Sequence, residues 1–218
     1  MAGNIVVLIS GRGSNLEALL QQELDGDIVA VISNRPDAGG LEHARQHGID
    51  AIGLDHRQYA DRSHFDTELI KQIDSYSPKL VVLAGYMRLL SGSFVSRYAG
   101  RLINIHPSLL PSFTGLHTHQ RALDEGVRMH GCTVHFVTAE LDHGPIIIQA
   151  AVPVMPHDTA AALAARVLTQ EHRIFPQAVR WFMQGRLTID GNRVVLKNDC
   201  AAASATLIHP PLDCETAP

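Results

Sequence analysis

The chain is long enough for one large domain and has only a slight excess of negative charge. Its 218 residues include 18 Lys and Arg against 22 Asp and Glu, which gives a net charge of −4. A chain of this length buries roughly 70% of its unfolded surface. Because no basic block is present to neutralise a phosphate backbone, the sequence argues against nucleic acid as a partner.

Cysteine usage and apolar segments favour a cytoplasmic protein. Cys132, Cys200 and Cys214 are odd in number and widely spaced, so neither a disulfide framework nor a thiolate metal site is expected. The apolar start at residues 5–9 is too short for a signal peptide. Since no apolar run approaches the ~18 residues of a membrane span, we expect no membrane partner.

The first half of the chain alternates short β-branched runs with helix-like stretches. This alternation is typical of a parallel sheet covered by helices. Strands are expected at residues 5–9, 28–33, 51–54 and 80–84, and helices at residues 16–24, 41–46 and 65–75.

The second half changes character after a strand at residues 101–105. Further strands are expected at residues 132–137 and 146–152. A helix is expected at residues 159–183, with Asp158 or Thr159 as its N-cap and a break or restart at Pro176. Asp190-Gly191 predicts a hairpin after this helix. Because residues 199–218 show no periodicity, a disordered tail is predicted there. The fold class is therefore α/β, with a mainly parallel twisted sheet, helices on both faces and a Rossmann-like topology.

The turn Ser10-Gly11-Arg12-Gly13-Ser14-Asn15 follows the first expected strand and opens the first helix. Glycines let backbone N–H groups approach an anion, and a helix N-terminus supplies free donors, so the turn suits a phosphate. The third glycine of a dinucleotide fingerprint would fall at Leu16, which favours a mononucleotide-like phosphate. Alternatively, Ser14 and Glu17 form only a capping box in a tight turn.

The segment Asn104-Ile105-His106-Pro107 closes the strand at residues 101–105. Alternating side chains place Asn104 and His106 on one face, and Pro107 ends the strand. The pair then lies at the carboxyl end of the sheet, where open α/β folds bind ligands. An amide donor beside a proton shuttle suits catalysis, although a buried Asn and His can also merely satisfy loop backbone.

Asp142 lies in the loop between the two late strands, before Gly144-Pro145. As a catalytic residue it would orient His106 and stabilise its imidazolium; as an isolated loop residue it would form a turn. Spacing alone does not place it beside His106. The sequence contains no serine nucleophile elbow or reactive-cysteine environment, so a covalent intermediate is not expected.

These pieces, in this order, resemble the 10-formyltetrahydrofolate-dependent formyltransferases, and most closely the phosphoribosylglycinamide formyltransferases, over about residues 5–187. The segments that carry the resemblance are IVVLISGRGSN, VVLAGYMRLLS, GRLINIHPSLLPSF followed by GLHTHQRAL, HGCTVHFVTAELDHGPII and RVLTQEH. Methionyl-tRNA formyltransferases carry an additional C-terminal RNA-binding domain, and formyltetrahydrofolate hydrolases an N-terminal regulatory one. Neither addition is expected here.

The resemblance implies a site at the junction of two halves of one compact domain, a mononucleotide-binding half at residues 1–100 and a folate-binding and catalytic half at residues 101–190. The catalytic residues implied are Asn104, His106 and Asp142. The ribonucleotide side implied is Gly13, Ser14 and Asn15 with Gln170 and Glu171. The folate side implied is Arg62, Met87, Arg88, Leu89 and Leu90, together with Asn104, Thr138, Ala139, Glu140, Leu141 and Asp142.

The same resemblance implies the reaction. The formyl group of 10-formyltetrahydrofolate, the co-substrate, passes to the amine of glycinamide ribonucleotide in purine biosynthesis, by direct attack and without a metal. His143 departs from the family pattern, which has a smaller residue such as Gly there, and this puts the loop conformation in question. A homodimer is compatible with the resemblance, but the sequence does not decide the oligomeric state.

Two other functions stay open at this stage. A metal hydrolase would use His117 and His119 with a third ligand from His106, His135 or Asp142. A non-catalytic nucleotide-binding module would need only the glycine turn and the sheet. Without the resemblance, Met87 to Leu90 would be interpreted as ordinary packing after a strand.

Overall fold

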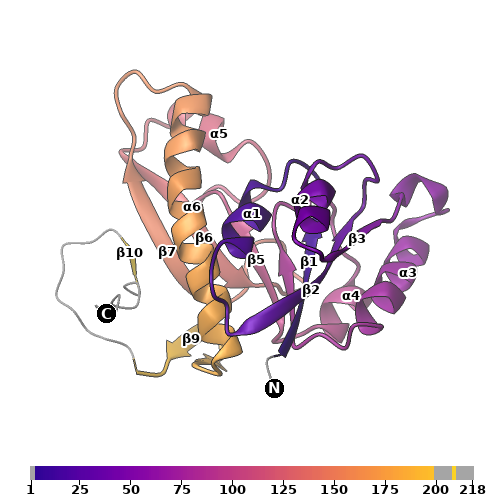
Figure 1. Cartoon of the computed structure of the whole chain (residues 1–218). Coiled ribbons are helices and arrows are strands. Elements are labelled where there is room, and N and C mark those ends of the chain that lie inside the picture. The colour runs from indigo at the N-terminus through magenta and orange to yellow at the C-terminus, as the bar shows by residue number, and fades with distance from the viewer. Residues whose placement is uncertain (1–2, 199–207, 210–218) are drawn as a thin grey trace.

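The computed structural model describes residues 3–198 and 208–209, which form a single twisted sheet with helices on both faces (Figure 1). The strand order is β3-β2-β1-β4-β5-β6-β7-β9-β8, and β10 pairs with β7 off this path. Strands β1 to β5 run parallel, whereas β6 is antiparallel to β5 and to β7. The α/β class with a mainly parallel sheet is therefore confirmed.

The strands of the parallel half are short and apolar because both of their faces are covered. Their bounds are Gly3–Ile9 for β1, Gly26–Ser33 for β2, Asp50–Gly53 for β3, Leu80–Leu83 for β4 and Leu102–His106 for β5. The strand that carries Asn104 thus ends directly before Pro107, as predicted.

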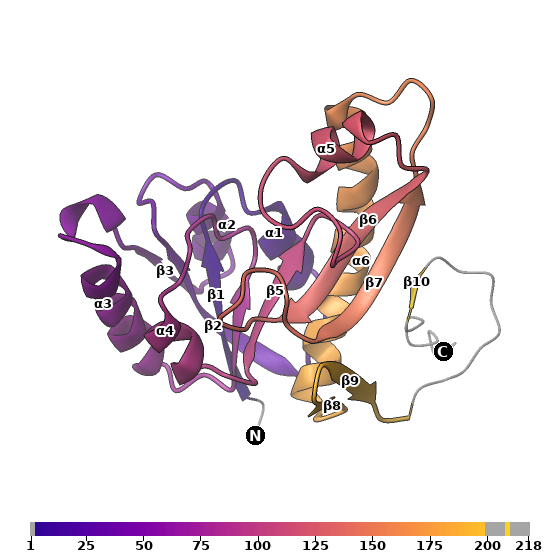
Figure 2. The same ribbon diagram turned by 180° about the vertical axis from the view of Figure 1, so that it is seen from behind.

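The antiparallel half extends the sheet beyond β5. Its bounds are Met129–Phe136 for β6, Ile146–Pro153 for β7, Leu187–Asp190 for β8, Arg193–Leu196 for β9 and Ile208–His209 for β10. Strands β8 and β9 form the hairpin that Asp190-Gly191 predicts. Viewed from behind, the loop between β6 and β7 turns back across the sheet near β5 (Figure 2).

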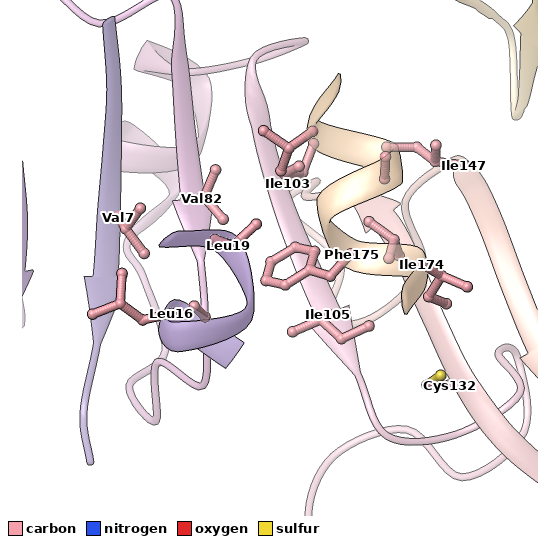
Figure 3. Packing of buried hydrophobic residues seen from close by; sticks show 14 of the residues in the cluster. Val7, Leu16, Leu19, Val82, Ile103, Ile105, Cys132, Ile147, Ile174 and Phe175 are labelled. Atoms are coloured by element: carbon pink, nitrogen blue, oxygen red, sulfur yellow. The ribbon is translucent and has the colours of Figure 1, made fainter. Parts of the chain in front are cut away.

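Helices cover the two faces in two separate groups. Their bounds are Ser14–Leu20 for α1, Gly40–Gln46 for α2, Arg62–Asp74 for α3, Gly92–Arg97 for α4, Thr118–Asp124 for α5 and Ala160–Met183 for α6, with a 3-10 turn at His56–Gln58. Helices α1, α2, α5 and α6 contribute to the larger hydrophobic cluster, where Phe175 of α6 and Leu16 of α1 face Ile103 and Val82 (Figure 3). Helices α3 and α4 pack on the opposite face, over Val6, Leu8 and Leu102.

Three local predictions are wrong. Helix α6 runs through Pro176 without a break, and the proline is buried with its neighbours Phe175 and Gln177, so packing outweighs the lost hydrogen bond. The N-cap of α1 is Gly13, one residue before Ser14, and no side chain caps it, so the Ser14–Glu17 capping box does not form. Helix α1 also ends at Leu20 and not at Leu24.

The predicted disordered tail, residues 199–218, is corrected at two positions. Ile208 and His209 pair antiparallel with Ala150 and Gln149 of β7. Strand β9 pairs with β7 only at Ile146, so the rest of that edge offers unpaired backbone groups that another strand can use. The other tail residues, including Cys200 and Cys214, lie outside the described residues. Within residues 3–198 and 208–209, no helix is both long and apolar enough to cross a membrane.

Candidate functional site

The candidate catalytic residues lie on the α3/α4 face of the sheet. Leu102 packs into the cluster under α3 and α4, whereas Ile103 and Ile105 pack on the opposite face. Because side chains alternate along a strand, Asn104 and His106 follow Leu102 on its face, beyond the end of the apolar packing. The sequence therefore predicts their placement correctly.

Asp142 lies beside His106, which spacing alone could not establish. The loop between β6 and β7 brings Asp142 Oδ2 to 3.6 Å from His106 Nδ1, and only 7% of each side chain is exposed. Asp142 Oδ2 also accepts a hydrogen bond of 2.8 Å from the backbone N–H of Gly115. The residue has a φ of 56°, a left-handed conformation that Asp tolerates better than most side chains. The carboxylate is thus held at the imidazole from two sides.

The two nitrogens of His106 have different partners. Nε2 is 3.0 Å from the carbonyl oxygen of Phe113, which can only accept, so Nε2 carries a proton. Nδ1 faces Asp142 beyond hydrogen-bond distance. Nδ1 is therefore the ring nitrogen that is available to a substrate, and the Asp142 carboxylate lies next to it.

His135 completes this group, and sequence reasoning considered it only as a strand residue and a possible metal ligand. It pairs with Asn104 across β5 and β6. Its Nδ1 lies 2.9 Å from the Phe136 carbonyl and must donate, so Nε2 of the neutral ring accepts from Asn104 Nδ2 at 3.2 Å. Burial lowers the pKa of His135, which the Phe136 carbonyl and Asp142 partly oppose. A polar residue directly opposite Asn104 on an antiparallel strand is the signal that could have identified it.

The glycine turn is shaped by backbone contacts. Gly13 has a φ of 84°, and a Cβ added there would lie 2.7 Å from the Cα of Gly40 at the start of α2. The Gly40 N–H also donates to the Gly11 carbonyl at 3.0 Å. The glycine at position 13 is therefore required by the fold, independently of any ligand.

Helix α6 meets the glycine turn at Glu171, as the resemblance implies. Asn15 Nδ2 donates to Glu171 Oε2 at 2.7 Å, and the Glu171 side chain is buried. Burial raises the pKa of Glu171, and the Asn15 hydrogen bond lowers it by a smaller amount. Gln170 is half-buried and accepts a hydrogen bond from Arg173 on its own helix. Ser14, Asn15 and Glu171 are thus brought together at one end of the sheet.

The residues implied for folate include large apolar side chains that are exposed, whereas residues with only a packing role would be buried. Met87 is 70% exposed, Leu89 54% and Leu141 52%. Leu90 packs against the α3/α4 cluster, and the Arg88 guanidinium lies 4.9 Å from the centre of the Phe65 ring. Arg62, at the start of α3, and Thr138, Ala139 and Glu140 are exposed. Large apolar side chains left open beside polar ones are typical of a ligand-binding edge.

His143, the departure from the family pattern, stabilises the β6–β7 loop locally. Its Nδ1 lies 2.7 Å from the Leu141 carbonyl, and its Nε2 lies 3.8 Å from Glu140 Oε1. The side chain is 46% exposed, whereas only 7% of the Asp142 side chain is exposed. Its bulk is therefore accommodated without displacing Asp142 from His106.

The other histidines near the site do not form the metal centre that His117 and His119 could have indicated. The ring of His119 packs edge-on against His130, with centroids 5.2 Å apart. Burial and, to a smaller extent, the neighbouring His119 lower the pKa of His130 to about 4. No group of three His, Cys, Asp or Glu side chains among residues 3–198 and 208–209 is arranged to hold a metal ion.

Comparisons with known proteins agree with the geometry. The family model described as formyl transferase matches residues 3–179. The phosphoribosylglycinamide formyltransferase of Escherichia coli (strain K12) is 54% identical over 193 residues, which is 87% of this chain and 91% of the relative. The Haemophilus influenzae enzyme of that name is 42% identical over 196 residues, covering 88% and 92% of the two chains.

A solved structure extends the agreement to three dimensions. The glycinamide ribonucleotide transformylase 1 from Symbiobacterium toebii superposes with a TM-score of 0.87 at 50% identity, over 89% of this chain and 94% of that chain. The chain therefore belongs to the formyl transferase family, and within it to the phosphoribosylglycinamide formyltransferases, as its motifs predict.

Proposed function

We propose that the chain transfers the formyl group of 10-formyltetrahydrofolate to the amine of glycinamide ribonucleotide, as a step of purine biosynthesis. The observation that carries the proposal is the approach of Asp142 to His106, at 3.6 Å, beside Asn104 at the end of β5. The half-buried amide of Asn104 and the buried imidazole and carboxylate of His106 and Asp142 match the needs of acyl transfer to an amine.

The reaction begins with attack of the amine on the formyl carbon. This attack places negative charge on the formyl oxygen and positive charge on the attacking nitrogen. Asn104 donates one amide N–H to His135, which orients the amide and leaves the second N–H for the oxyanion. A donor preorganised in this way is worth ~100-fold or more in rate.

His106 supplies the second donor through Nδ1. The proton on Nε2 is committed to the Phe113 carbonyl, so only a doubly protonated ring can donate from Nδ1 as well. The Asp142 carboxylate lies beside Nδ1, where its negative charge offsets positive charge that develops on the ring during the reaction. Asp142 then assists transfer of the proton from the attacking nitrogen to the leaving nitrogen, through a water, and no covalent enzyme intermediate is formed.

The two substrates approach from different segments. The ribonucleotide phosphate binds at Gly13, Ser14 and Asn15, with Gln170 and Glu171 closing that side. The folate lies along Met87 to Leu90, Arg62 and the loop from Thr138 to Asp142, where apolar side chains are exposed to receive a ring. Residues 1–100 thus supply the glycine turn together with Arg62 and Met87 to Leu90, and residues 101–190 supply the catalytic group, the loop from Thr138 to Asp142, and Gln170 with Glu171.

Purified protein supplied with both substrates tests the proposal directly. We expect formylated ribonucleotide and tetrahydrofolate to appear in equal amounts, with activity unchanged after treatment with a chelator. Turnover lost on chelation and restored by a metal would favour the metal hydrolase. Saturable binding of the ribonucleotide without turnover, in folded protein with both substrates present, would identify a binding module and overturn the assignment.

A further inference from the structure

Ser10, the residue after β1, joins two loops that the proposed function assigns to different substrates. Its backbone N–H donates to the Gly85 carbonyl at 3.2 Å. Its hydroxyl oxygen accepts from the backbone N–H of Met87 at 2.8 Å. Ser10 is the first residue of the glycine turn, and Met87 begins the exposed segment assigned to folate. One buried residue therefore bonds the nucleotide side to the folate side.

The side chain is needed because the strand ladder shifts at this point. Strands β1 and β4 pair in parallel up to Leu8 and Leu83, and Ala84 N–H still donates to the Leu8 carbonyl. A regular ladder would continue from Ser10 to the carbonyl of Ala84, but the partner is Gly85, which has a φ of 75°. After this shift the Ser10 hydroxyl accepts from the backbone N–H of Met87.

Asn34, the residue after β2, is the second partner of the Ser10 hydroxyl. The Ser10 hydroxyl donates to Asn34 Oδ1 at 2.5 Å, and both side chains are buried, with 5% and 4% exposed. Because the Met87 N–H can only donate, the hydroxyl accepts from it with a lone pair and gives its single proton to Asn34. The chain of bonds from Met87 through Ser10 to Asn34 thus has one arrangement, which suits transmission of order between the loops.

We propose that Ser10 is a positioning residue that couples the two substrate sites, so that ribonucleotide bound at the glycine turn raises the affinity of the Met87–Leu90 segment for folate. The inference rests on the proposed function for the identity of the two ligands. Binding at one loop reduces the motion of Ser10, and the second ligand then finds Met87 already held. By linkage, folate raises the affinity for the ribonucleotide by the same factor.

Binding without turnover measures the coupling. Tetrahydrofolate carries no formyl group, so it forms a dead-end complex with glycinamide ribonucleotide. In the wild-type protein we expect saturating ribonucleotide to lower the Kd for tetrahydrofolate about fivefold or more by calorimetry. Ser10→Ala should reduce this factor to near one, and should raise the KM for formyl folate about three- to tenfold with little change in kcat at saturation.

Ser33→Ala is the matched control. Ser33 lies buried at the end of the neighbouring strand β2, and its hydroxyl oxygen accepts one backbone N–H, from Arg35, at 3.1 Å. Its loss removes a comparable buried hydrogen bond but no link between the two loops. We expect Ser33→Ala to retain the wild-type coupling factor. If Ser10→Ala does not fold, Asn34→Ala provides a second test, because the freed hydroxyl should weaken the coupling in part.

The outcomes separate the inference from the function on which it rests. Wild-type protein that binds neither ligand overturns the proposed function, and the coupling with it. Wild-type protein that binds both ligands independently, or a folded Ser10→Ala variant that keeps the full factor, overturns the coupling alone. Equal weakening of both affinities in Ser10→Ala with an unchanged factor would make Ser10 a structural residue only.

Discussion

The ends of β5 and β1 contribute to one edge of the sheet, but the two regions are built by different means. At the end of β5 the important groups are side chains. Asn104 is hydrogen-bonded to His135, His106 to the Phe113 carbonyl, and Asp142 to the Gly115 N–H. At the glycines of the turn that follows β1, the important groups belong to the backbone. Gly13 has a φ of 84° and contacts Gly40 through its main chain.

The difference determines what a substitution can reveal. A side chain on a strand held by packing can be changed with little effect on the path of the chain, so its loss reports on chemistry. A glycine whose conformation and neighbours exclude a Cβ cannot be changed without moving the backbone, so its loss reports on folding as well. Substitutions in both regions test this contrast.

His106→Ala tests whether the β5 side chains act mainly in the transition state. We expect kcat to fall by two or more powers of ten while the Kd for the ribonucleotide stays near the wild-type value, because an imidazole that serves the transition state adds little to ground-state affinity. Steady-state kinetics and calorimetry on the same preparation measure both. Near-normal turnover would leave His106 a structural residue.

Asp142→Asn keeps the size of the side chain and removes its charge. We expect turnover to fall about 100-fold, because a neutral amide does not favour the charged form of His106. If the two residues act as a unit, the double variant with His106→Ala should be scarcely slower than the slower single variant. Fully multiplicative losses would place Asp142 and His106 in independent roles.

Gly13→Ala tests the backbone half of the contrast. A side chain at a φ of 84°, with its Cβ 2.7 Å from Gly40 Cα, should lower the free energy of unfolding by about 1–3 kcal/mol. The same substitution should weaken ribonucleotide binding. Gly48→Ala is the control, because Gly48 has a φ of 69° with open space around its Cβ position. Urea denaturation gives the free energy of unfolding of both variants. Gly13→Ala combines an unfavourable φ with a clash against Gly40, whereas Gly48→Ala has the unfavourable φ alone. Equal stability of the two would remove the contact with Gly40 from the explanation.

Glu171→Gln tests the one buried carboxyl beside the glycine turn. Burial raises the folded-state pKa of Glu171 above its usual value of 4.5, so the stability linked to this group is present below that value and is lost as pH rises through the folded pKa. The variant lacks this dependence. We therefore expect its free energy of unfolding, relative to the wild type, to increase with pH above 4.5 and then level off. Denaturation curves at a series of pH values measure the difference, and a difference independent of pH would contradict a buried, titrating Glu171.

The contrast also explains what the sequence could predict. Period-two and helical patterns are local, and they located β1, β2, β5 and the β8–β9 hairpin within a few residues. The placement of Asn104 and His106 on one face follows from strand alternation alone. The wrong predictions, such as the break at Pro176, arose where tertiary burial outweighs local preference.

Contacts between distant segments needed the three-dimensional structure. Asp142 reaches His106 only because the β6–β7 loop folds back over β5, and no local pattern encodes that path. The pairing of His135 with Asn104 depends on the register between β5 and β6. The hydrogen bond between Ser10 and Met87 depends on the shift of the β1–β4 ladder at Gly85. The family resemblance brought Asp142 to attention, but the physical reason for its role is a distance.

His143→Gly, which restores the residue expected from the family, should have the smallest effect. His143 supports the loop through a hydrogen bond to the Leu141 carbonyl and an exposed pairing with Glu140, and exposed pairs of this kind contribute about 0–1 kcal/mol. Asp142 keeps its bond to Gly115 in the variant, so kcat should stay within about threefold of the wild type. The KM for formyl folate should rise slightly, because a glycine loop loses more entropy when it closes on its ligand. Kinetics at varied folate concentration test this, with His143→Ala as a control that removes the imidazole without adding glycine flexibility. A loss of kcat as large as that of Asp142→Asn would mean that His143, and not Gly115, holds the carboxylate against His106.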